Sequence, residues 1–408
     1  MKKVPVSFII AGAVIILLLA VLLIVGIPYF FEAPQFSGNA GATLGSQTVL
    51  AKITQIVDEG QINLNGRNQL YQVMQVEVLE GDYKGIPFQI DYGKRQVRND
   101  NFRFATGDEV YVEVDKTPNN VLQAYYVDYV RSKPLLILLI AFIVSMLIMG
   151  RWKGLGSLVS LGVSMMMIIG YVIPHILAGE DPVKVSLIGS VILLAATLYL
   201  TYGWNLKTHA SVASIMVSLL ITGALSVFFV YLTRLTGYGD ENATYLMQFS
   251  SVPIDPRGLL LGGMIIGSLG VLDDLVTSQS AAVVEIHDAN PSLGFRRTLQ
   301  KAMRIGQDHV AATVNTLVLA YTGAALPLLL IFTLGNGSYS YFINSEFLAE
   351  EIVRTLVGSL GLIAAVPIST FLATVIILYQ ERFGRWRPLL GPETGDEIER
   401  GHAEILKD

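Results

Sequence analysis

Long, nearly uninterrupted runs of apolar side chains recur along this sequence, and they constrain its fold more than any other feature. A helix of about 20 mainly apolar residues is long enough to cross the hydrocarbon core of a bilayer. Eight segments meet this description: 6–29, 134–150, 155–174, 183–202, 210–232, 257–280, 309–334 and 352–379. The sequence therefore predicts a polytopic α-helical membrane protein with about eight transmembrane helices.

The composition supports a membrane protein and excludes several other classes. Charged residues make up 15% of the chain, against about 25% in soluble domains, so an ordinary soluble enzyme is not expected. The net charge of −5 shows no basic excess, so we expect the lipid bilayer and not nucleic acid as a partner. The chain has no cysteine, which removes disulfides, thiolate metal sites and cysteine nucleophiles. No cofactor is indicated.

Lys and Arg gather in the loops that lie on one side of the predicted spans, which is the cytoplasmic side in most membrane proteins. This places both termini in the cytoplasm and the long polar stretch outside, although Arg131 and Lys133 count against it. The first apolar run is longer than a signal-peptide core, so an uncleaved anchor is expected. The predicted organisation is an N-terminal transmembrane anchor (1–31), an extracytoplasmic β-rich domain (32–133), a seven-helix bundle (134–380) and a cytoplasmic tail (381–408).

The extracytoplasmic stretch changes from apolar runs to short alternating ones. Gly, Asn and Asp turns such as Asn65-Gly66 separate five candidate strands: Val49–Val57, Tyr71–Leu79, Ile86–Tyr92, Glu109–Val114 and Gln123–Val130. Five short strands with such turns are typical of a small closed or half-closed β-barrel. We expect an OB-like barrel with a structural or partner-binding role.

Small residues and an acid share one face of the segment 257–280. Gly263, Gly267 and Gly270 fall at helical spacing, which lets another helix approach closely. Asp274 lies four residues after Gly270 and shares that face. The prediction is helix packing along the glycines, with Asp274 inside the bundle.

Ionisable groups inside membrane spans are costly and are therefore candidates for function. Asp274 is a candidate site for binding and releasing a proton or cation, with Ser278 one turn further on. Asp273 points about 100° away and is the second acid of the same site. The alternative is that the helix ends at Leu272 and both acids cap it in water.

Polar residues also mark the seventh and eighth apolar segments. Asp308 and Asn315 lie seven residues apart on one helical face, with Thr316 beside them, and this stripe either faces Asp274 or makes ordinary interhelical hydrogen bonds. Glu351 and Arg354 lie three apart and are expected to form an ion pair at the outer membrane boundary. Pro367 would kink or break the last span.

Signatures of catalysis and metal binding are weak. The string Gly237-Tyr238-Gly239-Asp240 matches the GxGD of intramembrane aspartyl proteases, but it lies in a predicted loop and lacks a partner acid in a span. No HExxH, GxSxG or GxxxxGK[ST] motif occurs, and these would indicate a metalloprotease, an α/β-hydrolase or an ATPase. Acids near His287 match no metal-ligand spacing. The chain is not expected to be an enzyme or to hold a metal.

Three strings, LGVLDDLVTSQSAAVVEIHDANPSLGF, RIGQDHVAATVNTLVLAYTGAALPLLL and EIVRTLVGSLGLIAAVPIST, resemble the YibE/F family of bacterial membrane proteins. The similarity covers roughly 130–380. The family has a single acid after its LG turn, which Asp274 matches and from which Asp273 departs. Other residues on family-typical positions are Asp308, Asn315, Thr316, Glu351 and Arg354. Over a shorter stretch, Leu269-Gly270 followed by Asp274 is similar to the LG-x-x-x-D of SecD in the resistance-nodulation-division superfamily, where that carboxylate belongs to a proton-coupled bundle.

These observations favour an ion- or proton-coupled transporter or accessory permease of unknown substrate. The alternative is a membrane scaffold or sensor that transports nothing and whose outside domain binds a partner; an intramembrane hydrolase is disfavoured by the missing motifs. A second membrane subunit of the same family is a possible partner.

Overall fold

The chain divides into two compact units. The computed structural model describes residues 47–97, 102–116, 121–250, 252–334 and 338–390. One unit lies within Asn39–Ser145 and the other within Met146–Asp408. The expected first span, 6–29, and most of the expected tail lie outside the described residues.

The smaller unit contains one antiparallel sheet of five strands. Its strands are β1 (Gln47–Leu64), β2 (Arg67–Val78), β3 (Pro87–Tyr92), β4 (Glu109–Lys116) and β5 (Leu122–Tyr129). Their order in the sheet is β3-β2-β1-β4-β5. Each of the five predicted runs overlaps one of these strands, and Asn65-Gly66 forms the predicted turn with both residues at positive φ. An OB-like closure of the sheet stays a prediction.

Strand β1 is the longest strand and organises the sheet. It pairs with β2 through Ala51–Leu64 and with β4 through Gln47–Lys52. Two irregularities in the β1–β2 register bend β1, as bulges do. The fully buried Gln72 on β2 holds the chain at Phe104, donating from Nε2 to its carbonyl and accepting its N–H at Oε1.

Six helices of the chain are long and apolar enough to cross a membrane, by length and composition. They are Ser132–Arg151, Gly154–Leu177, Pro182–Tyr202, Leu206–Leu232, Pro256–Ala289 and Glu346–Leu378. Each overlaps one of the predicted spans. The first is the N-terminal part of α3 (Ser132–Met167), which is kinked at Arg151 where φ is 47°. The second is the rest of α3 together with the two short elements that follow it, to Leu177.

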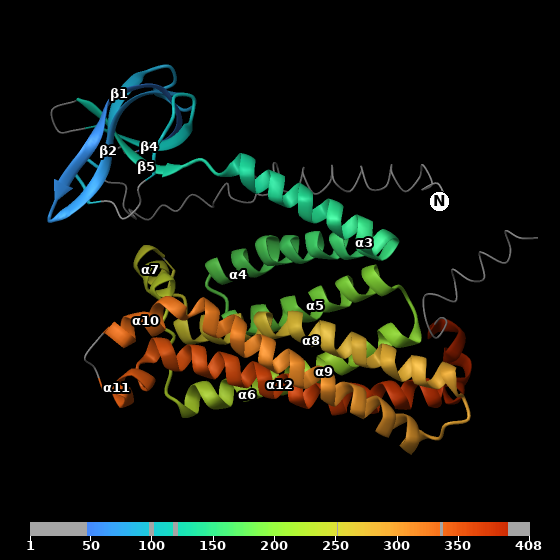
Figure 1. The fold of residues 1–408 in the computed structure, drawn as a ribbon. Helices are drawn as coiled ribbons and strands as arrows, with labels where there is room; N and C mark the ends of the chain where they lie inside the picture. The colour runs from blue at the N-terminus through green and yellow to red at the C-terminus, as the bar shows by residue number, and fades with distance from the viewer. Residues whose placement is uncertain (1–46, 98–101, 117–120, 251, 335–337, 391–408) are drawn as a thin grey trace, which may run out of the picture. The chain divides into compact units, whose positions relative to one another are not determined.

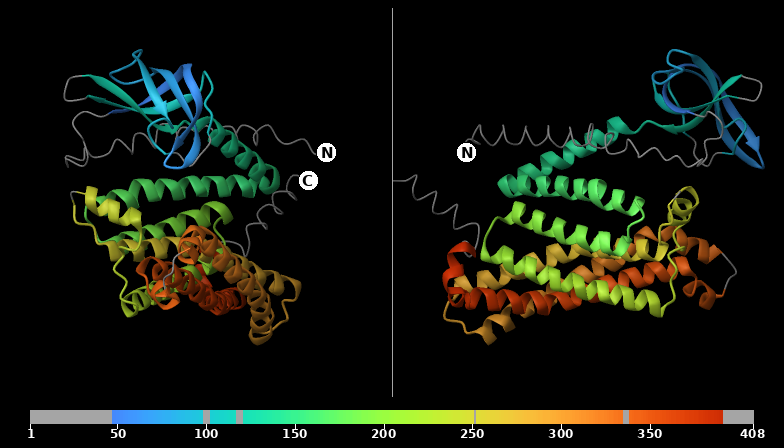
Figure 2. Two further views of the ribbon diagram at one scale, coloured as in Figure 1. Left: turned by 60° about the vertical axis from the view of Figure 1, so that its left-hand side comes forward. Right: turned by 180° about the vertical axis from the view of Figure 1, so that it is seen from behind.

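The remaining elements of the larger, helical unit follow in chain order. They are the π-helical turn η2 (Ile168–Val172), α4 (Ile173–Leu177), α5 (Pro182–Tyr202), α6 (Leu206–Leu232), α7 (Glu241–Phe249), α8 (Pro256–Ala289), α9 (Phe295–Ala324), α10 (Leu326–Leu334), α11 (Tyr339–Ile343), α12 (Glu346–Leu378) and the 3-10 turn η3 (Gln380–Leu390). Figures 1 and 2 show α5, α6, α8, α9 and α12 packed side by side as a bundle. Pro367 lies inside α12, which stays helical on both sides of it.

The expected span 309–334 is not one helix. α9 begins at Phe295, before the expected start of the span, and ends at Ala324, and α10 begins at Leu326. Pro327 explains the break, because a proline lacks the backbone N–H and its ring collides with the preceding turn. Neither helix is among the six that are long and apolar enough to cross a membrane.

The tightest helix contact joins α6 and α12. A Cβ added to Gly361 would lie only 2.2 Å from Thr222 Oγ1, so glycine is required there. Along α6 a ladder of buried hydroxyls faces inward, and each donates to the carbonyl four residues before it: Ser214, Ser218, Thr222 and Ser226. Small residues that satisfy their own hydroxyls let two membrane helices approach closely.

A buried side-chain amide links the three helices α8, α9 and α12. Gln279 on α8 is 1% exposed. Its Nε2 donates to the Ala302 carbonyl of α9 at 2.8 Å and to Thr370 Oγ1 of α12 at 2.7 Å. A Cβ on Gly306 would lie 2.8 Å from Gln279 Oε1, so α9 must present a glycine here.

The loop between α6 and α7 is fastened to the start of α12 by two carboxylates. Glu346 accepts hydrogen bonds from the Thr236 backbone and hydroxyl. Glu350, 3% exposed, accepts the Gly239 N–H at 3.1 Å. A Cβ on Gly239 would lie 2.7 Å from the Glu350 carboxyl carbon, and one on Gly237 would collide with the Pro256 carbonyl. The GxGD string of this loop thus serves close packing.

We expect Gly361→Ala to lower the free energy of unfolding by about 1–3 kcal/mol, because the new methyl group collides with Thr222 in a packed contact. Chemical unfolding in detergent micelles, followed by circular dichroism, measures the change. Gly358→Ala is the matched control, since its Cβ would meet Leu317 at an ordinary 3.6 Å. Equal stability of the two variants would contradict the contact.

Candidate functional site

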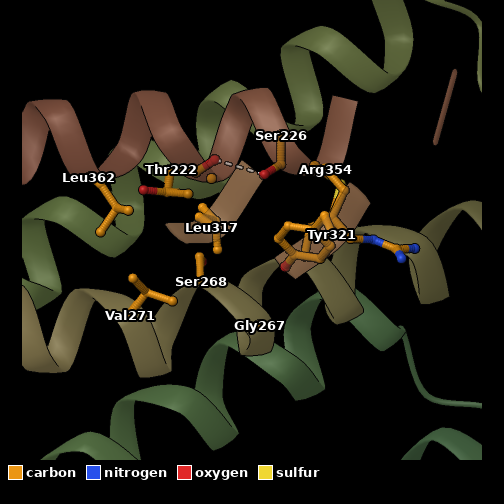
Figure 3. A pocket seen from close by; sticks show the side chains of 11 residues that line it. Thr222, Ser226, Gly267, Ser268, Val271, Leu317, Tyr321, Arg354 and Leu362 are labelled. Atoms are coloured by element: carbon orange, nitrogen blue, oxygen red, sulfur yellow. Dashed lines mark hydrogen bonds between the residues drawn. The ribbon is translucent and has the colours of Figure 1, made fainter. Parts of the chain in front are cut away.

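A small polar pocket with a cavity volume of about 10 Å³, room for about one water molecule, lies inside the helical unit, between α6, α8, α9 and α12. Figure 3 shows its lining from all four helices. Leu362, Val271 and Leu317 give it apolar walls, and Tyr321 and Arg354 lie toward its other end. Its remaining polar lining comes from the hydroxyls of Thr222, Ser226 and Ser268. We refer to this site as the bundle pocket.

The hydroxyl groups of Thr222, Ser226 and Ser268 offer the bundle pocket hydrogen-bond acceptors and not donors. Thr222 donates to the Ser218 carbonyl and Ser226 to the Thr222 carbonyl, both at 2.8 Å. Ser268 donates to the Ile265 carbonyl at 2.9 Å. Because each hydroxyl proton is directed to its own helix, the oxygen lone pairs remain available. A neutral hydrogen-bond donor is the complementary guest for them.

Arg354 carries the charge of the pocket lining and is held by a neighbour. Its Nη1 donates to Glu351 Oε1 at 2.5 Å, and each side chain is 27% exposed. The ion pair predicted from their spacing is therefore present, one turn along α12. Its depth relative to a membrane stays a prediction.

Asp274 does not lie inside the bundle as predicted. Its side chain is exposed in the described chain, on the same row of α8 as Gly267. The two residues are seven apart, which places them within about 20° around the helix and about 10 Å apart along it. Asp274 therefore lies on the α8 row that borders the bundle pocket.

Asp273 is the more buried of the two acids. It is half-buried, and its Oδ1 is fully buried with no hydrogen-bond partner among the described residues. Thr277, one turn on, donates to the Asp273 backbone carbonyl and leaves the carboxylate free. The two adjacent acids point to different sides of α8, and the buried side holds Asp273.

The predicted glycine face also differs from the observed packing. A Cβ on Gly263 or Gly270 would meet nothing within 4 Å, and one on Gly267 would meet only Tyr321 Oη at 3.7 Å. The close helix contact falls instead on Gly262, whose Cβ would lie 2.4 Å from Ser186 Oγ of α5. α8 has two rows of glycines, and spacing alone does not tell which one packs.

The polar stripe predicted on α9 lies at the surface of the described chain. Asp308, Asn315 and Thr316 are exposed, and so is Ser278 on α8. Thr316 donates to the carbonyl of Ala312 in its own helix. No hydrogen bond or ion pair joins this stripe to Asp274 among the described residues.

The sequence interpretation missed the hydroxyls of α6. They recur every three to four residues in a segment that was considered only for its apolarity, and that period places them on one face. Gln279 was also missed. An amide inside a predicted span is a signal of the same kind as an acid, and it could have been found near Asp274.

The fold and this site define a polytopic helical membrane protein with a polar pocket enclosed by its bundle. A family model, YibE/F-like protein, matches residues 138–378. The chain belongs to this family, and the match spans the helices from the first half of α3 to the end of α12. Comparison with curated proteins gives no match, and comparison with solved structures gives none either.

We expect Arg354→Gln to lower the free energy of unfolding by about 1–3 kcal/mol, because it leaves the carboxylate of Glu351 half-buried without its charged donor. Adding Glu351→Gln should recover part of this loss. The double-mutant cycle, measured by unfolding in detergent micelles, reports the coupling. A coupling energy of zero would show that the pair contributes nothing to stability.

Proposed function

We propose that this protein is a proton-coupled membrane transporter or accessory permease, with Asp273 as the proton-binding carboxylate and a widened form of the bundle pocket as the substrate-binding region. The observation that carries the proposal is the buried, unpartnered Oδ1 of Asp273 in the middle of a span. A buried carboxylate oxygen without a donor is unfavourable, and a proton satisfies it. A metal cation would need several oxygen ligands, whereas one carboxylate suffices for a proton.

Helix α8 supplies the link that coupling requires. Gly267 and Ser268 line the bundle pocket, and Asp273 lies about one and a half turns further along the same helix. Asp274 lies on the pocket side and Asp273 on the buried side. A change in charge at Asp273 therefore acts on the helix that also shapes the pocket, and occupation of the pocket acts on Asp273 in return.

The proposal includes the topology predicted from the basic loops. The protein would lie in the cell membrane with both termini in the cytoplasm and the β unit outside, and the β unit would complete an OB-like barrel. No catalytic step is proposed. A second membrane subunit of the same family would cover the exposed polar stripe of Asp308, Asn315 and Thr316, because lipid leaves such groups unsatisfied.

A groove in the β unit supports the second candidate, a scaffold or sensor that transports nothing. The groove is lined by Pro87–Asp91 of β3, by Gly93–Gln96 in the segment after β3, and by Leu122–Tyr126 of β5. β3 and β5 are the outer strands of the sheet order. An extended peptide binds to such edges by adding a strand. In this candidate the acids of α8 have no part in function.

We expect Asp273→Asn to abolish proton flux in liposomes that carry the protein and a trapped pH dye, under an imposed proton gradient. The amide cannot bind and release a proton, so flux should fall to the leak of protein-free liposomes. Asp274→Asn should reduce flux less, and Asp308→Asn, at an exposed position, is the matched control.

Three outcomes have different meanings. Loss of flux in Asp274→Asn alone would return the proton site to Asp274. Equal flux in all variants would remove both acids as carriers. Absence of flux in the unmodified protein, with normal behaviour of both acid variants in cells, would favour the scaffold or sensor.

A further inference from the structure

Six polar side chains in the helical unit have a buried atom without a hydrogen-bond partner in the described part of the chain. They are Ser186, Ser190, His209, Asp273, Ser280 and His287. The contrast with the rest of the bundle is sharp, since the buried hydroxyls of α6 and those of Ser359, Ser369, Thr370 and Thr374 on α12 each donate to their own helix. Five of the six belong to α5 and α8, and the sixth is Nε2 of His209 on α6, whose Nδ1 is bonded to Tyr199 Oη of α5.

The three groups on α8 lie on one line. Asp273, Ser280 and His287 follow each other at intervals of seven residues, so each is turned only about 20° from the one before. Gly262 lies on the same line, and its close contact with Ser186 of α5 shows which neighbour this line faces.

The two groups on α5 complete the line from the opposite side. Ser186 is 1% exposed and Ser190 is 2% exposed, and they lie one turn apart. α5 and α8 run beside each other in Figures 1 and 2. We call the row formed by these five residues the α5–α8 seam.

The length of the seam is comparable to the thickness of the hydrocarbon core of a membrane. Gly262, at the level of Ser186, and Ser280 are about 27 Å apart along α8, and His287 lies about 10 Å beyond. The hydrocarbon core of a bilayer is about 30 Å thick. The unsatisfied groups thus extend along most of the depth of a span, with Asp273 between the serines of α5 and Ser280.

Each of these groups needs a partner that the protein does not supply. A buried hydroxyl or carboxylate without a hydrogen bond costs about 1–3 kcal/mol or more, and such groups in native proteins are commonly satisfied by ordered water. Water that bridges hydroxyls and acids in a row is also a chain along which protons move, as in the proton relays of pumps and transporters.

We infer that the α5–α8 seam holds a file of water molecules that carries protons to and from Asp273. This inference rests on the proposed function, for which it supplies the route. His287 of the seam is itself ionisable, and few other ionisable groups lie near the route. Asp274 adjoins Asp273 on the other side of α8, and beyond Lys184 the ionisable side chains of α5 are Tyr199 and Tyr202. Tyr199 is engaged with His209 Nδ1 at 2.7 Å.

The seam and the bundle pocket lie on different faces of α8. The line through Gly262 and Asp273 is turned by about 120° from Gly267, which lines the pocket. Protons and substrate would therefore follow separate routes that share one helix wall. This arrangement separates the seam from the pocket in any test that uses single substitutions.

The test is water accessibility of single thiols, which the cysteine-free sequence makes unambiguous. Ser190→Cys and Ser280→Cys place a thiol in the seam of the full-length protein in liposomes. Ser214→Cys is the matched control, because Ser214 is equally buried and its hydroxyl donates to the Ala210 carbonyl on α6. Silver ions, which pass through narrow water files, are added and the remaining thiols are then counted with a maleimide tag after denaturation.

We expect silver to block both seam thiols about tenfold faster than the Ser214→Cys thiol, because only a hydrated thiol ionises and reacts readily. Equal, slow blocking of all three would overturn the water file. In the same liposomes Ser280→Ala should lower proton flux about tenfold while Ser214→Ala leaves it unchanged, and unchanged flux in Ser280→Ala would overturn the proton route.

The two measurements also separate this inference from the proposed function. Proton flux that depends on Asp273 while the seam thiols stay unreactive would overturn the seam and leave the proposed function intact. Rapid blocking in a protein that conducts no protons would overturn proton conduction along the seam together with the proposed function, and would leave only a hydrated interface.

Discussion

A hydrogen-bonding group inside a membrane has only the protein and a few water molecules to bind, and the helical unit is organised by this constraint. The hydroxyls of α6 and α12 meet it locally, by donating to their own helices, and the two helices can then pack on small side chains at Thr222 and Gly361. Gln279 meets it across the bundle, by joining α8 to α9 and α12. The bundle pocket and the α5–α8 seam are the places where it is met least completely.

Where the sequence pattern has one meaning, the prediction agrees with the structure. The five strand runs and the Asn65-Gly66 turn are present because alternation and positive-φ residues favour few other conformations. Six apolar segments are helices of spanning length for the same reason.

Where a pattern has two meanings, the prediction was wrong. α8 carries glycines at 258 and 262 as well as at 263, 267 and 270, and the first row makes the contact with α5. This choice also decides which acid is buried, because Asp273 and Asp274 are about 100° apart. Only the position of the neighbouring helix settles it.

The same helix therefore has two chemically distinct sides. One carries Gly267, Ser268 and Asp274 beside the bundle pocket, and the other carries Asp273 and Ser280 along α5. The neighbours differ too, since the pocket side meets hydroxyls that accept and an arginine, whereas the seam side meets serines with free donors. The fastening of the α6–α7 loop by Glu346 and Glu350 fixes the start of α12, which forms the far wall of the pocket.

The first half of α3 buries much less of its surface than the other long helices do. Only 6% of its apolar stretch is buried within the chain, and the backbone is kinked at Arg151 immediately after it. The match to the family begins at residue 138, inside this helix, and leaves the β sheet out. A helix that buries so little against its neighbours can accept a new N-terminal fusion without disturbing the packed helices that follow. The junction at this helix is thus a point where a different N-terminal domain can be joined to the same packed helices.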